Sequence, residues 1–253
     1  MRLLVTRPQP QAADWVARLS ATGFEAAALP LLRTVASEEP AAPAAREAVA
    51  RCDGVVFVSP AAVTHFFEAA RGVWPWAAGR WAAAPGPGTA RCLAAAGVPA
   101  QCIVQPAADA DQFDSEALWQ QLRLHVRPGA AVVIVRGDGG RDWLAQALAA
   151  AGAQVRFVQA YRRMPPAPTP EERVVLDEAL REPASHLWLF SSAEAIGHLE
   201  SIAPGADWSA ALALATHPRI EARARQLGCS RVWTSRPSFD AVVAAARAVA
   251  GTP

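Results

Sequence analysis

The sequence predicts an α/β protein made of two similar lobes, each a parallel sheet covered by helices. One observation is an internal repeat: Leu3–Pro8 recurs as Val132–Gly137, and Val55–Ala62 recurs as Leu187–Glu194, in the same order. A second is that the strand-like runs are continuously apolar, which is typical of parallel strands buried on both faces. A repeated series of strand–turn–helix units indicates two lobes, and we expect a small molecule to bind in a cleft between them.

The elements of the first half follow from local patterns. Leu3–Val5 is a short apolar strand, and Trp15, Val16 and Leu19 then share one helical face. Gly23 ends that helix, because glycine adopts the left-handed conformation of a helix C-terminus easily. Val55–Val58 is the next clear strand, and Pro60 is placed for the first turn of the helix after it.

The second half repeats this order. Val132–Val135 is a strand, and a helix containing Trp143 and Leu148 leads to Gly152 as the first helix leads to Gly23. Val155–Tyr161 and Leu187–Phe190 are the following strands, with the sequence patterns of helix starts after them. These are Ser191 with Glu194 as a capping box, Pro218 in a first turn, and Ser238 as a cap of the last helix.

Two segments lack any periodicity and are predicted to be connectors. They are Val35–Pro43 and the proline-rich Met164–Pro170, at equivalent points of the two repeats. The junction between the repeats, near His125–Gly129, is less linker-like. The linker-like segments thus lie within the repeats and not at the junction between them, which indicates that the spatial domains do not coincide with the sequence repeats.

Composition narrows the class of protein. A chain of 253 residues with 52% hydrophobic residues is long enough for two domains, each with its own core. No apolar run reaches the length of a membrane span, and the N-terminus has no signal-peptide layout. A net charge of +1 gives no support for nucleic-acid binding. The four cysteines (Cys52, Cys92, Cys102 and Cys229) have no metal-ligand or CxxC spacing, so we expect unpaired thiols in a reducing cytoplasm.

All 24 basic residues are arginine. Without lysine, neither a Schiff base nor a P-loop lysine is available, so an anion must be bound by arginine and backbone N–H groups. A dinucleotide fingerprint also fails twice, because Asp142 and Arg91 stand where its third glycine is needed. No spacing typical of a metal site is present.

Six turns follow predicted strands, and each is rich in Gly, Ser, Thr or Pro. Such a turn at a helix N-terminus is suited to bind anions, although any single one is more typical of an ordinary capped helix. Six together favour a ligand with several anionic groups. The turns are Thr6–Pro8, Ser59–Ala61, Pro85–Thr89, Arg136–Arg141, Ser191–Ala193 and Thr216–Arg219.

Tyr161 is the only tyrosine in the chain and ends a strand just before the second connector. Two interpretations stay open on position alone. The phenol packs at a hinge between the lobes, or it donates a proton or hydrogen bond to a leaving group.

Taken together, the motifs resemble the uroporphyrinogen-III synthase family over about residues 3–249. They are Leu4–Pro8, Phe57–Val63, Gly86–Ala90, Asp114–Leu118, Val135–Gly137 with Gly140–Arg141, Tyr161–Arg163, Phe190–Ala193, and His217–Ile220 with Ala224–Arg225 and Leu227–Gly228.

The resemblance implies two flavodoxin-like domains joined by a two-stranded β ribbon, the first domain being discontinuous. Residues 1–34 would join 166–253, residues 40–161 would form the second domain, and 35–39 and 162–165 would link them. It implies that hydroxymethylbilane, a linear tetrapyrrole with eight carboxylates, loses water and closes with inversion of its terminal ring to give uroporphyrinogen III. It implies no metal or organic cofactor, a cytoplasmic monomer, and a transient contact with the preceding deaminase.

The resemblance assigns Tyr161 as the general acid. It also implies a set of substrate-binding residues in the six turns: Arg7, Ser59, Pro60, Gly88, Thr89, Arg136, Gly137, Arg141, Ser191, Ser192, His217, Pro218, Arg219 and Ile220. Two alternatives remain: a non-catalytic two-lobed binding protein for a polyanion, and a nucleotide-dependent enzyme of Rossmann type.

Overall fold

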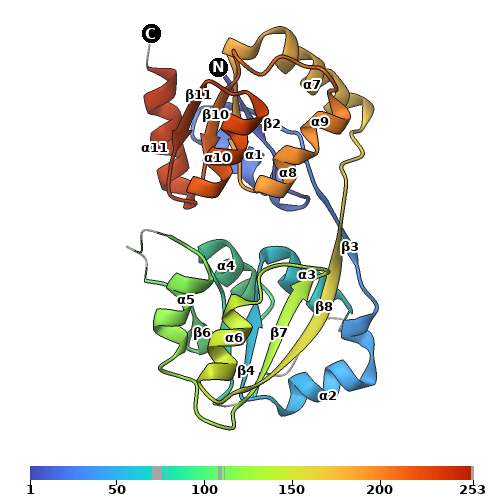
Figure 1. Ribbon diagram of the computed structural model, residues 1–253, viewed down its shortest axis with the longest axis vertical. Coiled ribbons are helices and arrows are strands. Elements are labelled where there is room, and N and C mark those ends of the chain that lie inside the picture. The colour runs from blue at the N-terminus through green and yellow to red at the C-terminus, as the bar shows by residue number, and fades with distance from the viewer. Residues whose placement is uncertain (70–75, 78, 108–109, 111, 252–253) are drawn as a thin grey trace. The chain divides into compact units, whose positions relative to one another are not determined.

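The computed structural model describes residues 1–251 except 70–75, 78, 108–109 and 111. Its internal contacts divide the chain into two units. Unit 1 combines Met1–Thr34 with Met164–Pro253, and unit 2 is Val35–Arg163. Each unit is an α/β body around its own sheet (Figure 1).

Unit 1 has a five-stranded sheet in the order β11-β10-β9-β1-β2, and every neighbouring pair is parallel. Its N-terminal segment contributes two strands, and β1 lies between β2 and β9. The elements are β1 (Arg2–Val5), α1 (Gln11–Ala21), β2 (Glu25–Ala28), α7 (Pro170–Arg181), η3 (Pro183–Ser185), β9 (His186–Phe190), α8 (Ala193–Gly197), α9 (Leu199–Ile202), β10 (Leu212–Ala215), α10 (Pro218–Leu227), β11 (Arg231–Thr234) and α11 (Phe239–Ala250).

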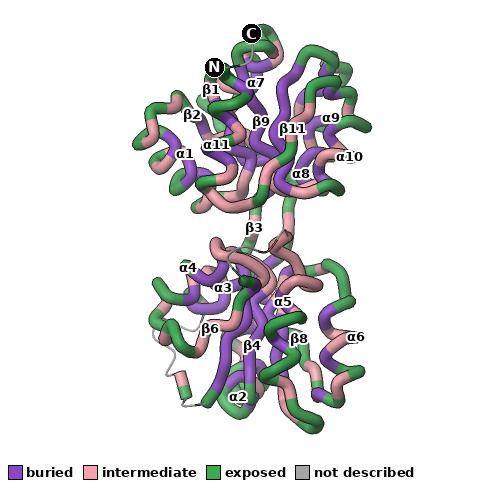
Figure 2. The backbone as a smooth tube through the Cα atoms, turned by 90° about the vertical axis from the view of Figure 1, so that its left-hand side faces the viewer, coloured by how far each residue is buried: buried purple, intermediate pink, exposed green. Residues whose placement is uncertain are grey.

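Helices cover both faces of the unit 1 sheet. On one face Leu3 and Leu189 pack against α1 and α11, and on the other Leu4 and Trp188 pack against α7 to α10. Alternate residues of β1 and β9 therefore enter different cores, although Leu3–Val5 and all of β9 are buried; β9 is drawn as buried in Figure 2. This is why the strands read as continuous apolar runs.

Unit 2 has a six-stranded sheet in the order β3-β8-β7-β4-β5-β6. The strands from β8 to β6 are parallel. The elements are β3 (Arg33–Ala36), η1 (Glu39–Ala41), α2 (Pro43–Arg51), β4 (Gly54–Phe57), α3 (Pro60–Ala69), β5 (Trp81–Ala83), α4 (Pro87–Ala95), η2 (Ala100–Cys102), β6 (Ile103–Val104), α5 (Ser115–Leu122), β7 (Ala131–Gly137), α6 (Trp143–Ala150) and β8 (Gln154–Met164).

The unit 2 sheet is also covered on both faces. Phe57 and Val135 pack against α2, α3 and α4, while Val56 and Ile134 pack against α5 and α6. The cores on the two faces of this sheet enclose β4 and β7, which pair in parallel with Phe57 opposite Val135 at their carboxyl ends. The turns that follow these strands are thereby fixed side by side.

Several predicted helix ends are confirmed. Gly23 and Gly152 follow α1 and α6 with φ of 90° and 85°, Pro218 opens α10, and the Ser238 side chain accepts a hydrogen bond from the Ala241 N–H. Gly152 also lies against Pro128, where a Cβ would come within 3.2 Å of the proline Cα.

The predicted capping box of Ser191 with Glu194 is wrong. The cap of α8 is Ser192, whose side chain accepts from the Ala195 N–H at 3.2 Å. β9 extends through Phe190, so the chain needs one more extended residue before it can turn into the helix.

The predicted connectors are regular only in part: Val35 and Ala36 belong to β3, Glu39–Ala41 form η1 and Met164 ends β8, whereas residues 165–169 have no regular structure. The chain leaves unit 1 within β3 and returns within β8, and these are neighbouring strands at the edge of the unit 2 sheet. The Ser37 N–H donates to the Ala160 carbonyl at 2.9 Å, and Arg33 Nε donates to the Pro165 carbonyl at 3.1 Å. Strand pairing therefore orders residues whose sequence lacks an apolar period.

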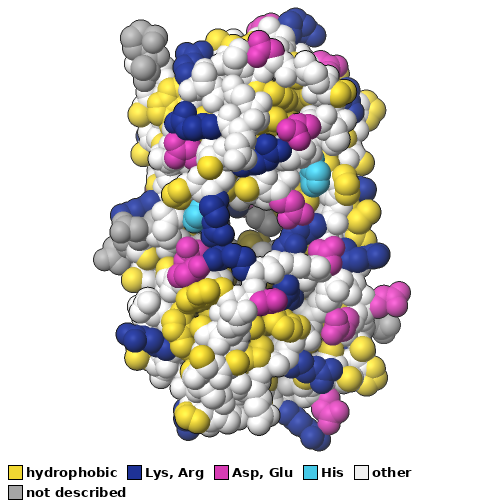
Figure 3. All heavy atoms as spheres, in the orientation of Figure 1, with side chains coloured by type: hydrophobic (Ala, Val, Ile, Leu, Met, Phe, Trp, Pro, Cys, Tyr) yellow, Lys and Arg dark blue, Asp and Glu magenta, His cyan; other side chains and the backbone are white. Residues whose placement is uncertain are grey.

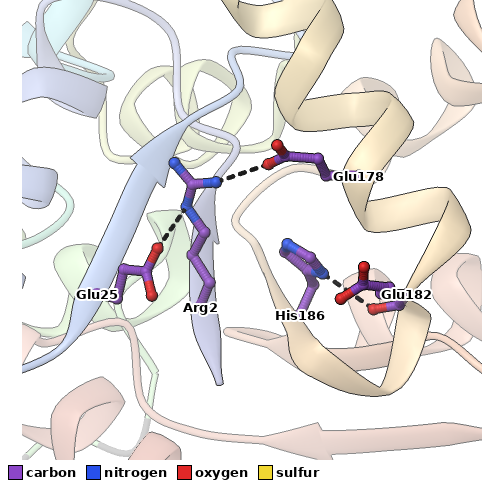
Figure 4. A network of polar contacts seen from close by, with 5 residues as sticks. All are labelled: Arg2, Glu25, Glu178, Glu182 and His186. Carbon is purple, nitrogen blue, oxygen red and sulfur yellow. Dashed lines mark hydrogen bonds and ion pairs between the residues drawn. The ribbon is translucent and has the colours of Figure 1, made fainter.

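At the amino ends of the unit 1 strands, charged side chains form a local network (Figure 4). Arg2 lies between Glu25, at 3.4 Å, and Glu178, at 2.9 Å, and His186 Nδ1 contacts the Glu182 carbonyl at 3.0 Å. The network ties β1 to β2 and α7. On the face drawn in Figure 3, arginine and acidic side chains are interspersed rather than segregated by sign. Among the described residues, no helix is both long and apolar enough to cross a membrane.

Candidate functional site

Three of the six predicted turns meet at one edge of the unit 2 sheet. Ser59–Ala61, Pro85–Thr89 and Arg136–Arg141 follow β4, β5 and β7, whose carboxyl ends point the same way because the strands are parallel. A pocket of about 180 Å³ opens there. Its lining is Val58, Ser59, Ser115, Ile134, Arg136, Gly139, Gly140, Arg141, Leu144, Ala145, Phe157, Tyr161 and Arg163.

Tyr161 is held tightly at the wall of this pocket. Its side chain is 4% exposed, and its hydroxyl lies 3.1 Å from Ser59 Oγ. Ser59 Oγ in turn accepts a hydrogen bond from the Ala62 N–H at 3.1 Å, as the cap of α3. The ring also lies against Gly137, where a Cβ would come within 2.8 Å of two ring carbons. Only a residue without a side chain at 137 allows this position of the ring.

A register shift aims Tyr161 at the pocket. Arg136 pairs with Gln159, but Gly137 pairs with Tyr161, so β8 carries one extra residue at this point. Such bulges redirect side chains and are common beside active sites. Tyr161 is therefore buried among the apolar side chains of the sheet and still lines the pocket.

The pocket is lined by three arginines, each paired with a carboxylate of the same unit. Arg136 Nη1 lies 2.5 Å from Asp142 Oδ1, and Arg163 Nη1 lies 3.6 Å from Asp138 Oδ1. Arg141 donates two hydrogen bonds to Glu116, which raise the pKa of its guanidinium. Arg136 also lies 4.7 Å from the centre of the Phe157 ring. The positive groups are thus positioned, and largely neutralised, before any anion binds.

The remaining unit 2 residues of the predicted site lie in neighbouring helix starts. Pro60 and Gly88 come close, since a Cβ on Gly88 would be 3.8 Å from Pro60 Cγ. Thr89 is 3% exposed in the first turn of α4, so its side chain is packed inside the unit. None of these three lines the 180 Å³ pocket.

In unit 1, the other three turns likewise follow parallel strands, namely β1, β9 and β10. Arg7 and Ser191 line a small cavity of about 10 Å³ together with Thr216. The Arg7 guanidinium lies 4.3 Å from the centre of the Trp15 ring, which holds the side chain over α1.

The other predicted unit 1 residues are at helix N-termini. Ser192 caps α8, and His217 caps α10 with its Nδ1 accepting from the Arg219 N–H at 3.1 Å. Pro218 and Arg219 are exposed, and Ile220 is buried in the core. Since Nδ1 accepts, the neutral ring carries its proton on Nε2.

Sequence reasoning missed Arg163 and Phe157 as members of the site. Both belong to β8, as does Tyr161, and both line the same pocket. The signal for Arg163 was available, because residues two apart in a strand point to the same face. Simple alternation also places Phe157, four residues before Tyr161, on that face, although the bulge between them breaks the strict alternation in the structure. Within the described residues, no group of three or more His, Cys, Asp or Glu side chains is placed to hold a metal ion.

Comparisons with known proteins agree on one family. The model of the family described as uroporphyrinogen-III synthase HemD matches residues 13–244. The chain is 34% identical over 166 residues to the uroporphyrinogen-III synthase of Salmonella typhimurium and 31% identical over 168 residues to that of Escherichia coli. Each match covers 64% of this chain and 65% of the relative.

Solved structures share the fold. A mutant uroporphyrinogen III synthase from Thermus thermophilus superposes with a TM-score of 0.55 at 20% identity, covering 99% of this chain and 98% of the other. Uroporphyrinogen-III synthetase from Helicobacter pylori gives a TM-score of 0.60 at 13% identity, covering 98% and 100%. At these identities the likeness establishes a mixed α/β fold with parallel sheets.

Proposed function

The chain belongs to the uroporphyrinogen-III synthase family, and we propose that it catalyses the reaction that gives the family its name. In this reaction hydroxymethylbilane loses water and closes, with inversion of its terminal ring, to uroporphyrinogen III. The observation that carries the proposal is Tyr161, a buried phenol fixed by Ser59 and Gly137 at the wall of an arginine-lined pocket.

The proposed chemistry is proton donation followed by ring closure. The phenol proton of Tyr161 passes to the hydroxyl oxygen of the substrate, the C–O bond breaks, and water leaves with the electron pair. The terminal ring attacks the resulting cationic carbon through its substituted position. The original bond from that position to the neighbouring methylene bridge then breaks, and the bridge carbon bonds to the free α-carbon of the same ring, which inverts the ring. The proton later released by the rearranging rings returns to the phenolate, so the net change is loss of one water. Holding the folded conformation is a positioning task, which rigid turns perform well.

Substrate carboxylates are proposed to bind the turns at the carboxyl ends of the strands. In unit 2 these supply Ser59, Pro60, Gly88, Thr89, Arg136, Gly137 and Arg141; in unit 1, Arg7, Ser191, Ser192, His217, Pro218, Arg219 and Ile220. Support comes from their location at strand ends and helix N-termini, where backbone N–H groups are available for anions.

We further propose that the two units are domains related by duplication and flavodoxin-like in topology, linked by a ribbon of β3 and β8 with linkers at 35–39 and 162–165. The strand orders support this. If β7 and β8 are counted as the first two strands of unit 2, the strands β8-β7-β4-β5-β6 lie in the same order as β2-β1-β9-β10-β11 in unit 1. Strands related by the sequence repeat then occupy equivalent places in the two sheets. In this arrangement each unit combines the first two strands of one repeat with the last three strands of the other, so unit 1 contains both ends of the chain.

The cytoplasm is the proposed compartment, and the absence of a disulfide among the four described cysteines is compatible with it. A transient contact with the deaminase that supplies the substrate is also part of the proposal. Its rationale is chemical, since the linear tetrapyrrole cyclises spontaneously to the wrong isomer.

One assay tests the activity. The purified chain is incubated with porphobilinogen and the deaminase that makes hydroxymethylbilane, and the oxidised products are separated by isomer. We expect mainly the type III isomer, and mainly type I in a control without the chain. Type I alone in both samples would reject the proposal and favour a non-catalytic polyanion-binding protein.

A further inference from the structure

Ser59 and Tyr161 are 102 residues apart in the sequence, yet their hydroxyl groups lie 3.1 Å apart. We propose that Ser59 is a positioning residue for Tyr161: it donates its hydroxyl proton to the phenol oxygen and leaves the phenol proton free to point into the pocket. The proposal rests on the proposed synthase activity. It gives the Ser59 hydroxyl a role that acts through Tyr161, while the proposed contact of this turn with substrate uses its backbone N–H groups.

The hydrogen-bonding capacity of the two groups supports this direction. A serine hydroxyl has one proton to donate and two lone pairs with which to accept. The Ala62 N–H can only donate, so it takes one lone pair of Ser59 Oγ and fixes the orientation of the side chain. When Tyr161 gives its proton to a substrate, it cannot also donate to Ser59. The contact then persists only with Ser59 as donor.

The ring of Tyr161 has little freedom to find another arrangement. It is 4% exposed, lies against the Cα of Gly137, and its centre is 5.9 Å from that of the His65 ring on α3. Ser59 caps the same helix, through Ala62. The same helix therefore contacts the ring through His65 and the phenol hydroxyl through Ser59, and only the direction of the hydrogen bond is left to change.

The expected effect on the reaction follows from the charge that develops. As the phenol proton moves to the leaving hydroxyl, negative charge grows on the phenol oxygen. A hydrogen bond to a charged acceptor is stronger than one to a neutral acceptor. Ser59 therefore stabilises the transition state more than the substrate complex, so its loss lowers kcat with little change of KM.

The test uses Ser59→Gly and Ser59→Thr. Glycine removes the hydroxyl but remains an acceptable helix cap, whereas threonine keeps both the hydroxyl and the cap. Ser238→Gly is the matched control, because Ser238 caps α11 in unit 1 through the Ala241 N–H and belongs to no proposed site. Formation of the type III isomer by the wild-type chain comes first, so that failure of the proposed activity is recognised separately.

We expect Ser59→Gly to lower kcat by about tenfold or more, with KM within about twofold, since a hydrogen bond to a charged group is lost. Ser59→Thr restores most of kcat, and Ser238→Gly leaves it unchanged. In a Tyr161→Phe background, Ser59→Gly causes no further loss, because both changes remove one interaction. An equal loss of kcat in both backgrounds would overturn the proposal, as it would show that Ser59 acts independently of Tyr161.

A spectroscopic measurement does not depend on turnover. Because Tyr161 is the only tyrosine, the tyrosine Fermi doublet in ultraviolet resonance Raman spectra reports its hydrogen bonding alone. We expect the doublet ratio to change in Ser59→Gly and to stay as in wild type in Ser238→Gly. An unchanged ratio in Ser59→Gly would overturn the proposal, whether or not the chain is a synthase.

Discussion

Tyr161 concentrates the proposed chemistry in one residue. Replacing it with phenylalanine keeps the ring in its buried place against Gly137 and removes only the hydroxyl. We expect kcat to fall by more than roughly tenfold, the scale of a positioned general acid. Isomer analysis of the product measures the rate, and circular dichroism checks that the fold is kept. Unchanged turnover would remove Tyr161 from the acid role and leave the family membership intact.

Gly137 is needed for space. A Cβ there would lie 2.8 Å from the Tyr161 ring, so Gly137→Ala must displace the ring or the strand. We expect a loss of about 1–3 kcal/mol in the free energy of unfolding, as for other overpacked sites, together with lower turnover.

The control for this change is Gly139→Ala in the same turn. There a Cβ would meet only Arg163 Nη1, at 3.7 Å, which is an ordinary contact. Denaturant unfolding of both variants compares them. If the two are equally stable, the close contact at Gly137 does not constrain the ring.

The four cysteines differ in the environment of their thiols. Burial raises the pKa of Cys52 and of Cys229 to about 11, while Cys92 and Cys102 are half-buried. The thiolate is the nucleophile that attacks a thiol reagent, so at pH 8 we expect Cys92 and Cys102 to react first and the buried pair only after denaturation. Mass spectrometry of the labelled peptides measures the order. Rapid labelling of Cys52 or Cys229 in the folded protein would contradict it.

At the scale of elements, the turn after β7 governs the charge of the pocket. Asp142 Oδ1 forms an ion pair with Arg136 Nη1 at 2.5 Å. The Asp142 side chain is 58% exposed, so this ion pair adds little to the stability of the fold. We expect Asp142→Asn to lower KM for the polycarboxylate substrate by roughly twofold to fivefold at low salt, and the effect to fade as salt screens the charges.

Glu47→Gln provides the matched control for Asp142→Asn. It makes the same change of charge in an exposed pair with Arg51 on α2. We expect it to leave KM unchanged. A similar decrease of KM in both variants would show that only the net charge matters, and that Asp142 does not compete with the substrate for Arg136.

Local sequence patterns predicted most elements correctly, because caps and turns depend on near neighbours. Gly23, Gly152, Pro218 and Ser238 act where their sequence patterns indicate. The helix cap was predicted at Ser191 but lies at Ser192, one residue later. Two adjacent serines are equally good caps, so the sequence does not reveal which one the helix uses. The bulge in β8 had no local signal either, since it arises from its pairing with β7.

At the scale of the whole molecule, the two units differ in continuity. Unit 2 is one segment with its own sheet and cores, whereas unit 1 needs both ends of the chain. We expect a fragment of residues 35–163 to unfold cooperatively on heating, as a small domain does. Circular dichroism and amide dispersion in NMR spectra would show it. A disordered fragment would contradict the independence of unit 2.

The complementary fragments test unit 1. Residues 164–253 lack β1 and β2, so β9 would have an exposed edge and the core would lose Leu3, Leu4 and Leu19. We expect this fragment to be unfolded alone and to gain structure when mixed with residues 1–34. A folded 164–253 fragment would show that β1 is dispensable.

The sequence by itself determined the α/β class, the order of strands and helices and several helix ends, and it singled out Tyr161 as a candidate site residue. These depend on apolar periodicity and on residues a few positions apart, which the chain encodes locally. Only the tertiary structure decided that Ser59 meets Tyr161, that Gly137 makes room for its ring, and that acidic partners neutralise the three pocket arginines. The Ser59–Tyr161 and Arg141–Glu116 contacts join residues far apart in the sequence, and the others depend on how neighbouring strands and their turns pack, so no local pattern could reveal them.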